Sequence, residues 1–315
     1  MFRFVSSKNS IELKKEYLAK YNVKLLQKKL DALLNKYPEI KVVLPIDISV
    51  RKLLVSNFRY LAKVYCAFTG YLNGKSQAEK IQILSDFVAG GFNYDSHSNK
   101  IAKFLTDVSN RFDIHNCVYC DLEEVTAFTK ANGQEVRRFE TEHVLDKGLC
   151  PLVALSLYNF VPSCGTCNGP ALKGTKTIGD TESEISKLSP SAEGYDFDGK
   201  VQFEVKVVTP GASDLKPTDH IEDYEIDFNV MDSIYQKSID LFELKQRYNS
   251  GNSKTELLKW MDKRRCNPDN IIQQIADIRK ITFEEAFEEM FELELRKRQH
   301  YTMEKARREV MGLDK

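Results

Sequence analysis

The chain has 315 residues, of which 42% are hydrophobic and 29% are charged, an ordinary composition for a globular protein. Its 46 lysines and arginines balance 46 aspartates and glutamates, which excludes a chain that is basic throughout, although a local basic groove remains compatible with it. The sequence has no run of about 18 apolar residues and no apolar core of a signal peptide at its start. We therefore expect a cytoplasmic protein without a membrane partner.

The first hundred residues have the pattern of helices. Residues 11–38 read as one helix that ends before Pro38, and residues 47–74 as a second. Leucines near the helical period mark the first of them: Leu26, Leu30, Leu33 and Leu34. A third helix begins with a capping box, Ser76 with Glu79, and a fourth covers about residues 96–110. We therefore interpret residues 1–110 as a helical N-terminal region.

The pattern changes to strands in the middle of the chain. Two strand-like runs surround Asn132-Gly133, a dipeptide that predicts a hairpin turn. The segment 195–208 suggests another small hairpin that turns at Asp198-Gly199. From about residue 226 the chain is helical again, with Thr282 and Glu285 as a further capping box. The expected class is α+β.

Two Cys-x-x-Cys pairs, Cys117 with Cys120 and Cys164 with Cys167, are the strongest local signal. Two such knuckles complete a tetrahedral Cys₄ zinc site, and a closed site of this kind is structural. The 43 residues between Cys120 and Cys164 leave room for a small domain. The alternative is two unrelated pairs, one of them redox-active, but the surrounding pattern lacks the βαβ context of that chemistry. The three isolated cysteines are expected to be small buried hydrophobic side chains and neither ligands nor nucleophiles: Cys66, Cys150 and Cys266.

Four short segments follow one another around the cysteine pairs: "NCVYC", "TEHVLDKG", "LSLYNFVPSCGTCN" and "LKG". Their ordered combination resembles the HNH endonuclease superfamily, the ββα-metal nucleases, over roughly residues 113–180. The resemblance implies a small ββα-metal core with a Cys₄ zinc site, flanked by helical regions. The expected regions are therefore 1–110, a nuclease core at 111–180, and a β hairpin followed by helices at 181–315.

The resemblance also implies a role for each candidate residue. His143 resembles the general base that takes a proton from the attacking water, and a histidine is neutral near cellular pH. Glu142 and Asn168 resemble the ligands of a single catalytic divalent cation, Mg²⁺ or Mn²⁺. Asn159 resembles the asparagine that orients the catalytic loop, and Lys173 resembles a lysine that contacts phosphate.

Two positions depart from the family pattern. The family usually has Asp before the histidine, whereas this chain has Glu142, whose extra methylene moves the carboxylate by about 1.5 Å. Lys173 lies five residues after Asn168, where the family often has about three. Each candidate also has a structural alternative: a satisfied histidine at a strand end for His143, and turn or cap residues for Asn159 and Asn168.

A nuclease needs basic side chains for phosphate. The candidates within the core are Arg137, Arg138, Lys147, Lys173 and Lys176. The basic clusters at 263–266 and 296–300 are expected to be solvated helix faces. The remaining histidines are expected to have no catalytic role: His97, His115, His220 and His300.

The region after the motif is similar to the tail of HNH effector nucleases in bacterial anti-phage defence systems, Septu-like or retron-associated. The resemblance implies a metal-dependent endonuclease, with DNA favoured over RNA as substrate, that is controlled by a protein partner or by self-assembly through the helical arms. The alternative is a zinc-stabilised nucleic-acid-binding or scaffolding module whose nuclease site has decayed.

Overall fold

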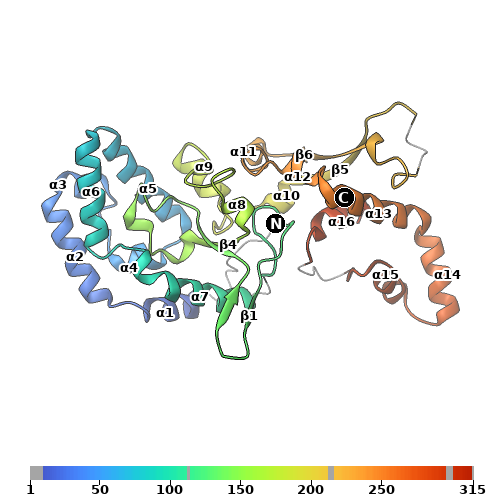
Figure 1. Cartoon of the computed structure of the whole chain (residues 1–315), viewed down its shortest axis with the longest axis horizontal. Coiled ribbons are helices and arrows are strands. Elements are labelled where there is room, and N and C mark those ends of the chain that lie inside the picture. Colours follow the sequence, from blue (N-terminus) through green and yellow to red (C-terminus); the bar gives the residue numbers. More distant parts are fainter. Residues whose placement is uncertain (1–9, 112–113, 212–215, 296–300, 314–315) are drawn as a thin grey trace. The chain divides into compact units, whose positions relative to one another are not determined.

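The structure is a computed structural model that describes residues 10–111, 114–211, 216–295 and 301–313. It divides into two compact units (Figure 1). The larger unit comprises residues 2–119 and 125–196, and the smaller unit comprises residues 120–124 and 197–315. The larger unit thus holds both the expected N-terminal helices and most of the expected central region.

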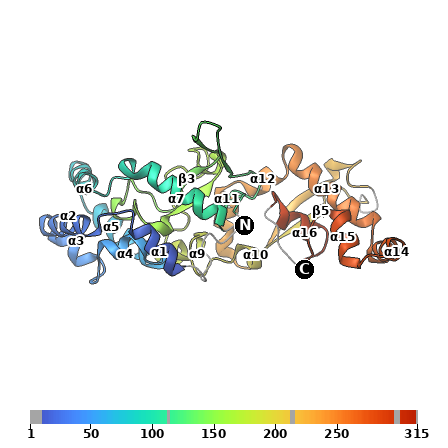
Figure 2. The same cartoon turned by 90° about the horizontal axis from the view of Figure 1, so that it is seen from below.

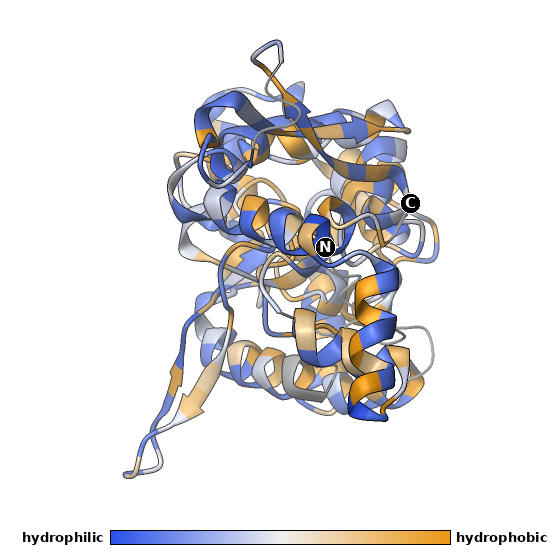
Figure 3. Cartoon of the chain, turned by 90° about the vertical axis from the view of Figure 1, so that its right-hand side faces the viewer, coloured by the Kyte–Doolittle hydropathy of each residue, from blue (hydrophilic) through white to orange (hydrophobic). Residues whose placement is uncertain are grey.

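Seven helices precede the strands of the larger unit. They are α1 (Ser10–Leu18), α2 (Val23–Lys36), α3 (Pro38–Val43), α4 (Val50–Val55), α5 (Phe58–Asn73), α6 (Gln77–Ala89) and α7 (Ser98–Arg111). The four leucines of α2 are buried as the periodicity predicts, and Ser76 and Glu79 form the expected capping box on α6. Figure 3 shows apolar and polar residues alternating along the helical ribbons, as expected for helices that bury one face.

Two of the expected helices are each broken in two. The first is interrupted before α2, where the side chain of Asn22 accepts a hydrogen bond from the backbone N–H of Leu25. The second is interrupted between α4 and α5, where Asn57 accepts in the same way from Tyr60. Asparagine side chains compete with the helical backbone carbonyls for these N–H donors. The spacing of apolar residues does not show this competition, so it predicted uninterrupted helices.

The N-terminal helices form hydrogen bonds to Leu155 and Ser156, in the loop that follows Glu142 and His143. The hydroxyl of Tyr17 on α1 donates to the backbone carbonyl of Leu155 at 2.8 Å, and both residues are buried. The hydroxyl of Ser156 donates to the carbonyl of Leu53 on α4. These bonds join helices near the start of the chain to a segment more than a hundred residues later.

Two small antiparallel sheets lie in the larger unit. Strands β1 (Ala127–Thr129) and β2 (Glu135–Arg137) form the hairpin predicted at Asn132-Gly133, and Gly133 has the positive φ of +83° that favours glycine there. Strands β3 (Glu140–His143) and β4 (Phe160–Ser163) pair with His143 opposite Phe160. Helix α8 (Gly165–Asn168) follows β4, and α9 (Glu182–Leu188) comes later; Figure 2 labels β3, and Figure 1 labels β4 and α8. Short 3₁₀ turns occupy Asp95–His97, Pro151–Val153 and Leu157–Asn159.

The smaller unit contains one two-stranded antiparallel sheet and a set of helices. Its strands are β5 (Val201–Val207) and β6 (Tyr224–Val230), which pair along their whole length. Its helices are α10 (Phe197–Lys200), α11 (Gln236–Leu241), α12 (Leu244–Tyr248), α13 (Gly251–Cys266), α14 (Asp269–Arg279), α15 (Phe283–Phe291) and α16 (Glu304–Val310), with 3₁₀ turns at Ile221–Asp223 and Ser233–Tyr235. The capping box of Thr282 and Glu285 on α15 is confirmed.

The hairpin predicted to turn at Asp198-Gly199 is wrong. Both residues lie in α10, and β5 begins at Val201 and pairs instead with β6, which begins 17 residues after the end of β5. In each strand of the pair the first and third residues are buried, so β5 and β6 share one apolar face. Together the two units form a mixed fold of helices and small antiparallel sheets, compatible with the α+β class. Among the described helices, none combines the length and apolar character that crossing a membrane requires.

Candidate functional site

The pairing of β3 with β4 brings the central candidate residues together. Glu142 and His143 end β3, opposite Val161 and Phe160 of β4. The chain then passes from β4 directly into Cys164, whose sulfur accepts from the backbone N–H of Cys167 at 3.4 Å at the start of α8. Two antiparallel strands followed by a short helix therefore carry the carboxylate, the histidine and the second cysteine pair.

The four cysteines of the two pairs form one buried group. The sulfur atoms of Cys117, Cys120, Cys164 and Cys167 all lie within 4.8 Å of one another, and none is in a disulfide. Four sulfurs at about 2.3 Å from a tetrahedral zinc ion are about 3.8 Å apart, so this set fits zinc. Backbone N–H groups of Leu122 and Cys167 point to sulfurs of the group, which favours the thiolate form. A closed set of four thiolates leaves no open position, so an ion held there would be structural.

His143 is buried among aromatic rings, with 8% of its surface exposed. The rings of Tyr94 and Phe160 pack edge-on against it at centroid distances of 4.5 and 4.9 Å. Burial, together with the nearby charge of Lys147, lowers the pKa of His143 to about 3, so the imidazole is neutral at cellular pH.

The hydrogen bond of His143 fixes which ring nitrogen can accept a proton. Nε2 lies 3.2 Å from the backbone carbonyl oxygen of Ala154. A carbonyl oxygen only accepts, so Nε2 carries the hydrogen and donates it. In a neutral imidazole the other nitrogen, Nδ1, then has the free lone pair and is the basic atom.

Glu142 forms a buried ion pair with Lys173. The side chains are 4% and 1% exposed, and the Lys173 ammonium also donates to the carbonyl of His143 at 2.9 Å. The Glu142 Oε1 atom lies in ion-pair contact with the ammonium, but the two groups are not aligned as a hydrogen bond. Burial raises the pKa of Glu142 to about 7, against the opposing effect of Lys173. Lys173 is therefore not placed as the phosphate contact that we expected, because its charged end points into the protein.

Asn159 is fully buried, and its side-chain amide makes three hydrogen bonds to the backbone. Its Oδ1 accepts from the N–H of Leu145 at 2.7 Å, and its Nδ2 donates to the carbonyls of Leu145 and Val153 at 3.0 Å each. The amide thus clamps the chain just after His143 to the turn that contains Ala154. The side chain therefore fixes the backbone at these two places, and its role in catalysis stays a prediction.

Asn168 is the last residue of α8 and is half-buried. Its backbone N–H donates to the carbonyl of Cys164 at 3.0 Å, which places the residue at the end of the second cysteine knuckle. No hydrogen bond joins the Asn168 side chain to Glu142 or His143 among the described residues.

The set around Glu142 does not fit a divalent cation in this conformation. The charged group that neutralises the carboxylate is the ammonium of Lys173, and within the described ranges no histidine or further carboxylate gathers with Glu142 into a cluster of three. A second cation beside the same carboxylate would repel the ammonium. Binding of Mg²⁺ or Mn²⁺ at Glu142 therefore requires Lys173 to move first.

The other basic candidates differ in environment. Lys147 lies over the ring of Tyr94 at 4.4 Å, and Arg137 is paired with Glu135, whereas Arg138 and Lys176 are exposed. In the cluster at 263–266, Lys263 covers the ring of Trp260 and Arg264 bonds to the backbone of Asn267. Both contacts are local, as expected for a helix face, and the cluster at 296–300, with His300, lies outside the described residues.

The remaining cysteines and histidines take different positions. Cys150 is buried as predicted, but Cys66 is half-buried and Cys266 is exposed, so the prediction for Cys266 is wrong. His97 packs against the ring of Tyr21, and His220 lies near the carboxylate of Asp223. The first contact joins residues far apart in the sequence and the second is local, and neither involves Glu142 or His143.

Sequence reasoning missed three features of the site. Tyr94 covers His143 from a turn 49 residues upstream, and the carbonyl of Ala154 fixes the tautomer, although neither position carries a motif. The partner of Glu142 was also missed, since a lysine 31 residues later gives no local sign of a buried pair. Only the tertiary fold brings these groups to Glu142 and His143.

We compared the chain with models of protein families, with curated proteins and with solved structures, and none matches. The chemistry of the site therefore rests on its own geometry.

Proposed function

We propose that the chain is an HNH-type endonuclease that hydrolyses phosphodiester bonds of nucleic acid, with DNA favoured over RNA. The observation that carries the proposal is the neutral His143, whose Nε2 bonds to Ala154 and whose Nδ1 is left as a base. The sequence resemblance implies a histidine base at the end of a strand pair, next to a carboxylate and in the same core as a Cys₄ group. His143 at the end of β3, Glu142 before it and the four cysteines fit this arrangement.

The residues of the chain have distinct tasks in this proposal. Nδ1 of His143 accepts the proton of the attacking water, and the carbonyl of Ala154 stabilises the imidazolium that results. Asn159 holds the backbone on both sides of this bond, so the ring keeps its direction during proton transfer. The Cys₄ group would hold a structural zinc ion that fixes α8 against the strands.

The catalytic Mg²⁺ or Mn²⁺ that the resemblance implies is part of the proposal only after Lys173 has left Glu142. In the described conformation the pair closes the site. A trigger that separates the two side chains would open it, in line with the proposed role of an anti-phage effector that a partner or self-assembly controls.

The same pair also favours a second candidate function. A carboxylate neutralised inside the chain and a histidine enclosed by aromatic rings are what a decayed nuclease site would contain. The chain would then be a zinc-stabilised module that binds nucleic acid or serves as a scaffold.

The test is cleavage of plasmid DNA and of RNA by the purified chain with Mg²⁺, Mn²⁺ or EDTA, with cell extract added as a source of an activator. The matched variants are His143→Ala, which removes the base, and Lys173→Met, which frees Glu142. Metal-dependent cleavage that is lost with His143→Ala and increased with Lys173→Met supports the nuclease. Equal cleavage by the His143→Ala variant and the parent would refute the assignment of the base. If neither the parent nor Lys173→Met cleaves or binds Mn²⁺, the second candidate is favoured.

A further inference from the structure

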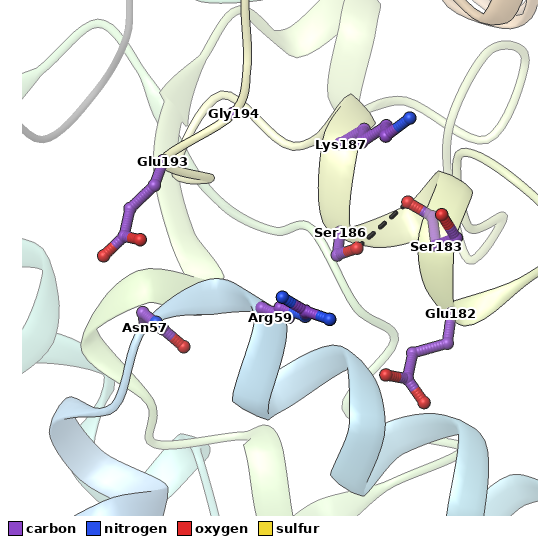
Figure 4. Close-up of a pocket in the computed structure, with 8 residues that line it drawn as sticks. All are labelled: Asn57, Arg59, Glu182, Ser183, Ser186, Lys187, Glu193 and Gly194. Carbon is purple, nitrogen blue, oxygen red and sulfur yellow. Dashed lines mark hydrogen bonds between the residues drawn. The ribbon is translucent and has the colours of Figure 1, made fainter.

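Two pockets in the larger unit adjoin one another beside the N-terminal helices. Their volumes are about 530 and 620 Å³, within the range of ligand sites, and both are lined by Asn57 and Glu193. Figure 4 shows the first pocket, with Arg59 on α5 and Lys187 on α9 at different sides of it. None of the residues that line either pocket belongs to the candidate nuclease site.

Basic side chains gather mainly in the second pocket, which has four of them against one carboxylate, whereas the first pocket has two basic and two acidic side chains. The six basic side chains come from four helices: Lys14 and Lys15 on α1, Arg51 and Lys52 on α4, Arg59 on α5, and Lys187 on α9. Only two acidic residues, Glu182 and Glu193, share the lining. The whole chain has no net charge, so this concentration of cations is a local feature of the fold and not of the composition.

Most of these cations have no acidic partner in the protein. Lys52 pairs with Asp47, and Lys14 lies over the ring of Tyr158 at 5.4 Å. In the part of the chain that the structure describes, no ion pair engages the other four: Lys15, Arg51, Arg59 and Lys187. Like charges around one hollow repel each other, and an anion bound among them would remove that repulsion.

The walls of the pockets are held by buried side chains, so the cations are placed on a rigid frame. Leu53 and Leu54 on α4 and Phe58 on α5 are buried, and Leu53 also receives the hydrogen bond of Ser156. Leu188 is buried beneath the α9 residues that line the first pocket. A preformed cationic hollow loses little entropy when it binds a ligand.

We infer that these pockets form a binding site for phosphate groups, provided by a nucleotide or by the backbone of a nucleic acid. Arginine and lysine are the side chains that recognise phosphate, as a planar fork and as a point charge respectively. The cations are spread over four helices. A ligand with several phosphates in a row can contact more of them than one small anion can. The inference does not depend on nuclease activity, because the site shares no residue with His143 or Glu142.

The test is binding by the full chain without added Mg²⁺ or Mn²⁺, so that cleavage plays no part. The probes are a fluorescein-labelled single-stranded oligonucleotide, measured by anisotropy, and a fluorescent ATP analogue. The variant carries Arg51→Ala, Arg59→Ala and Lys187→Ala, three exposed positions whose loss should leave the fold intact. We expect its dissociation constant for the bound probe to rise about tenfold or more. For the oligonucleotide, the slope of log affinity against log salt should fall by about 2, since three phosphate contacts are lost.

The matched control carries Lys24→Ala, Lys28→Ala and Lys41→Ala, which removes the same charge from exposed helix positions outside both pockets. Its dissociation constant should stay within about twofold of the parent's, because it keeps all six basic side chains of the pockets. Selective loss of oligonucleotide binding identifies nucleic acid as the source of the phosphates, and selective loss of ATP binding identifies a nucleotide. The inference is overturned if the parent binds neither probe, or if both triple variants lose affinity equally.

Discussion

Replacing Lys173 with methionine should lower the free energy of unfolding, because the Glu142 carboxylate would then be buried without a cation beside it. Methionine keeps nearly the length and volume of the lysine stem but removes the ammonium that faces the carboxylate. The side chains of the pair are 1% and 4% exposed, so water does not take over the role of the missing charge. Removing one partner of such a pair typically costs about 3–5 kcal/mol.

The cost should depend on pH in a direction that the structure fixes. Burial already raises the pKa of Glu142 to about 7, and removal of Lys173 takes away the contact that opposes this rise. At pH 6 the carboxyl group of the Lys173→Met variant is protonated and needs no partner, so the variant loses little. At pH 9 the folded variant must either bury the unpaired Glu142 carboxylate or keep Glu142 protonated at a pH where a free carboxyl group is ionised. Both states cost free energy, whereas the parent has its ion pair. The loss of unfolding free energy should therefore approach the full 3–5 kcal/mol, about that of a broken buried pair, only at the higher pH.

Urea unfolding at both pH values measures this difference. Far-UV circular dichroism is the suitable signal, because Trp260 lies in the smaller unit and its fluorescence does not report on the larger one. The exposed Lys176→Met is the matched control, with an expected change within about 0.5 kcal/mol. The double variant Glu142→Gln with Lys173→Met removes both charges and should recover most of the stability at pH 9. A loss below about 1 kcal/mol at pH 9, or an equal loss at both pH values, would show that the pair is not the buried one described here.

Three further predictions test the rest of the site. Cys164→Ser should lower the zinc content, measured by mass spectrometry, from one ion per chain and lower the melting temperature, whereas the exposed Cys266→Ser should change neither. Asn159→Ala leaves the buried backbone N–H and carbonyl of Leu145 without partners and removes one of two bonds to the Val153 carbonyl, so it should cost about 3 kcal/mol in urea unfolding; a cost near zero would contradict the clamp. His143 has a pKa of about 3 when folded and an ordinary value near 6.5 when unfolded, so its contribution to stability is present above pH 6.5 and is lost as the pH falls towards 3. Between pH 7 and pH 4 the parent should therefore lose about 3 kcal/mol more than His143→Gln, and parallel pH profiles of the two proteins would refute the burial of the ring.

Predictions from the sequence were confirmed where the residues of one short segment determine the structure. The hairpin at Asn132-Gly133 and the capping boxes at Ser76 and Thr282 formed as predicted, because each depends on residues only a few positions apart. Predictions failed where a distant segment competed. The turn at Asp198-Gly199 did not form, because β5 found its partner in β6.

The sequence by itself determined which chemical groups the site can contain, and the tertiary structure decided what those groups do. The spacing of the two cysteine pairs was enough to predict a single four-sulfur group, since a thiolate pair separated by two residues reaches one ion by local geometry. The state of Glu142 and His143 was not predictable in this way. Their pKa values are set first by desolvation, and then by the charges of Lys173, which lies far along the chain, and of the nearby Lys147. Burial is a property of the folded core and not of any segment, so only the fold decided that the carboxylate is paired and the imidazole is neutral.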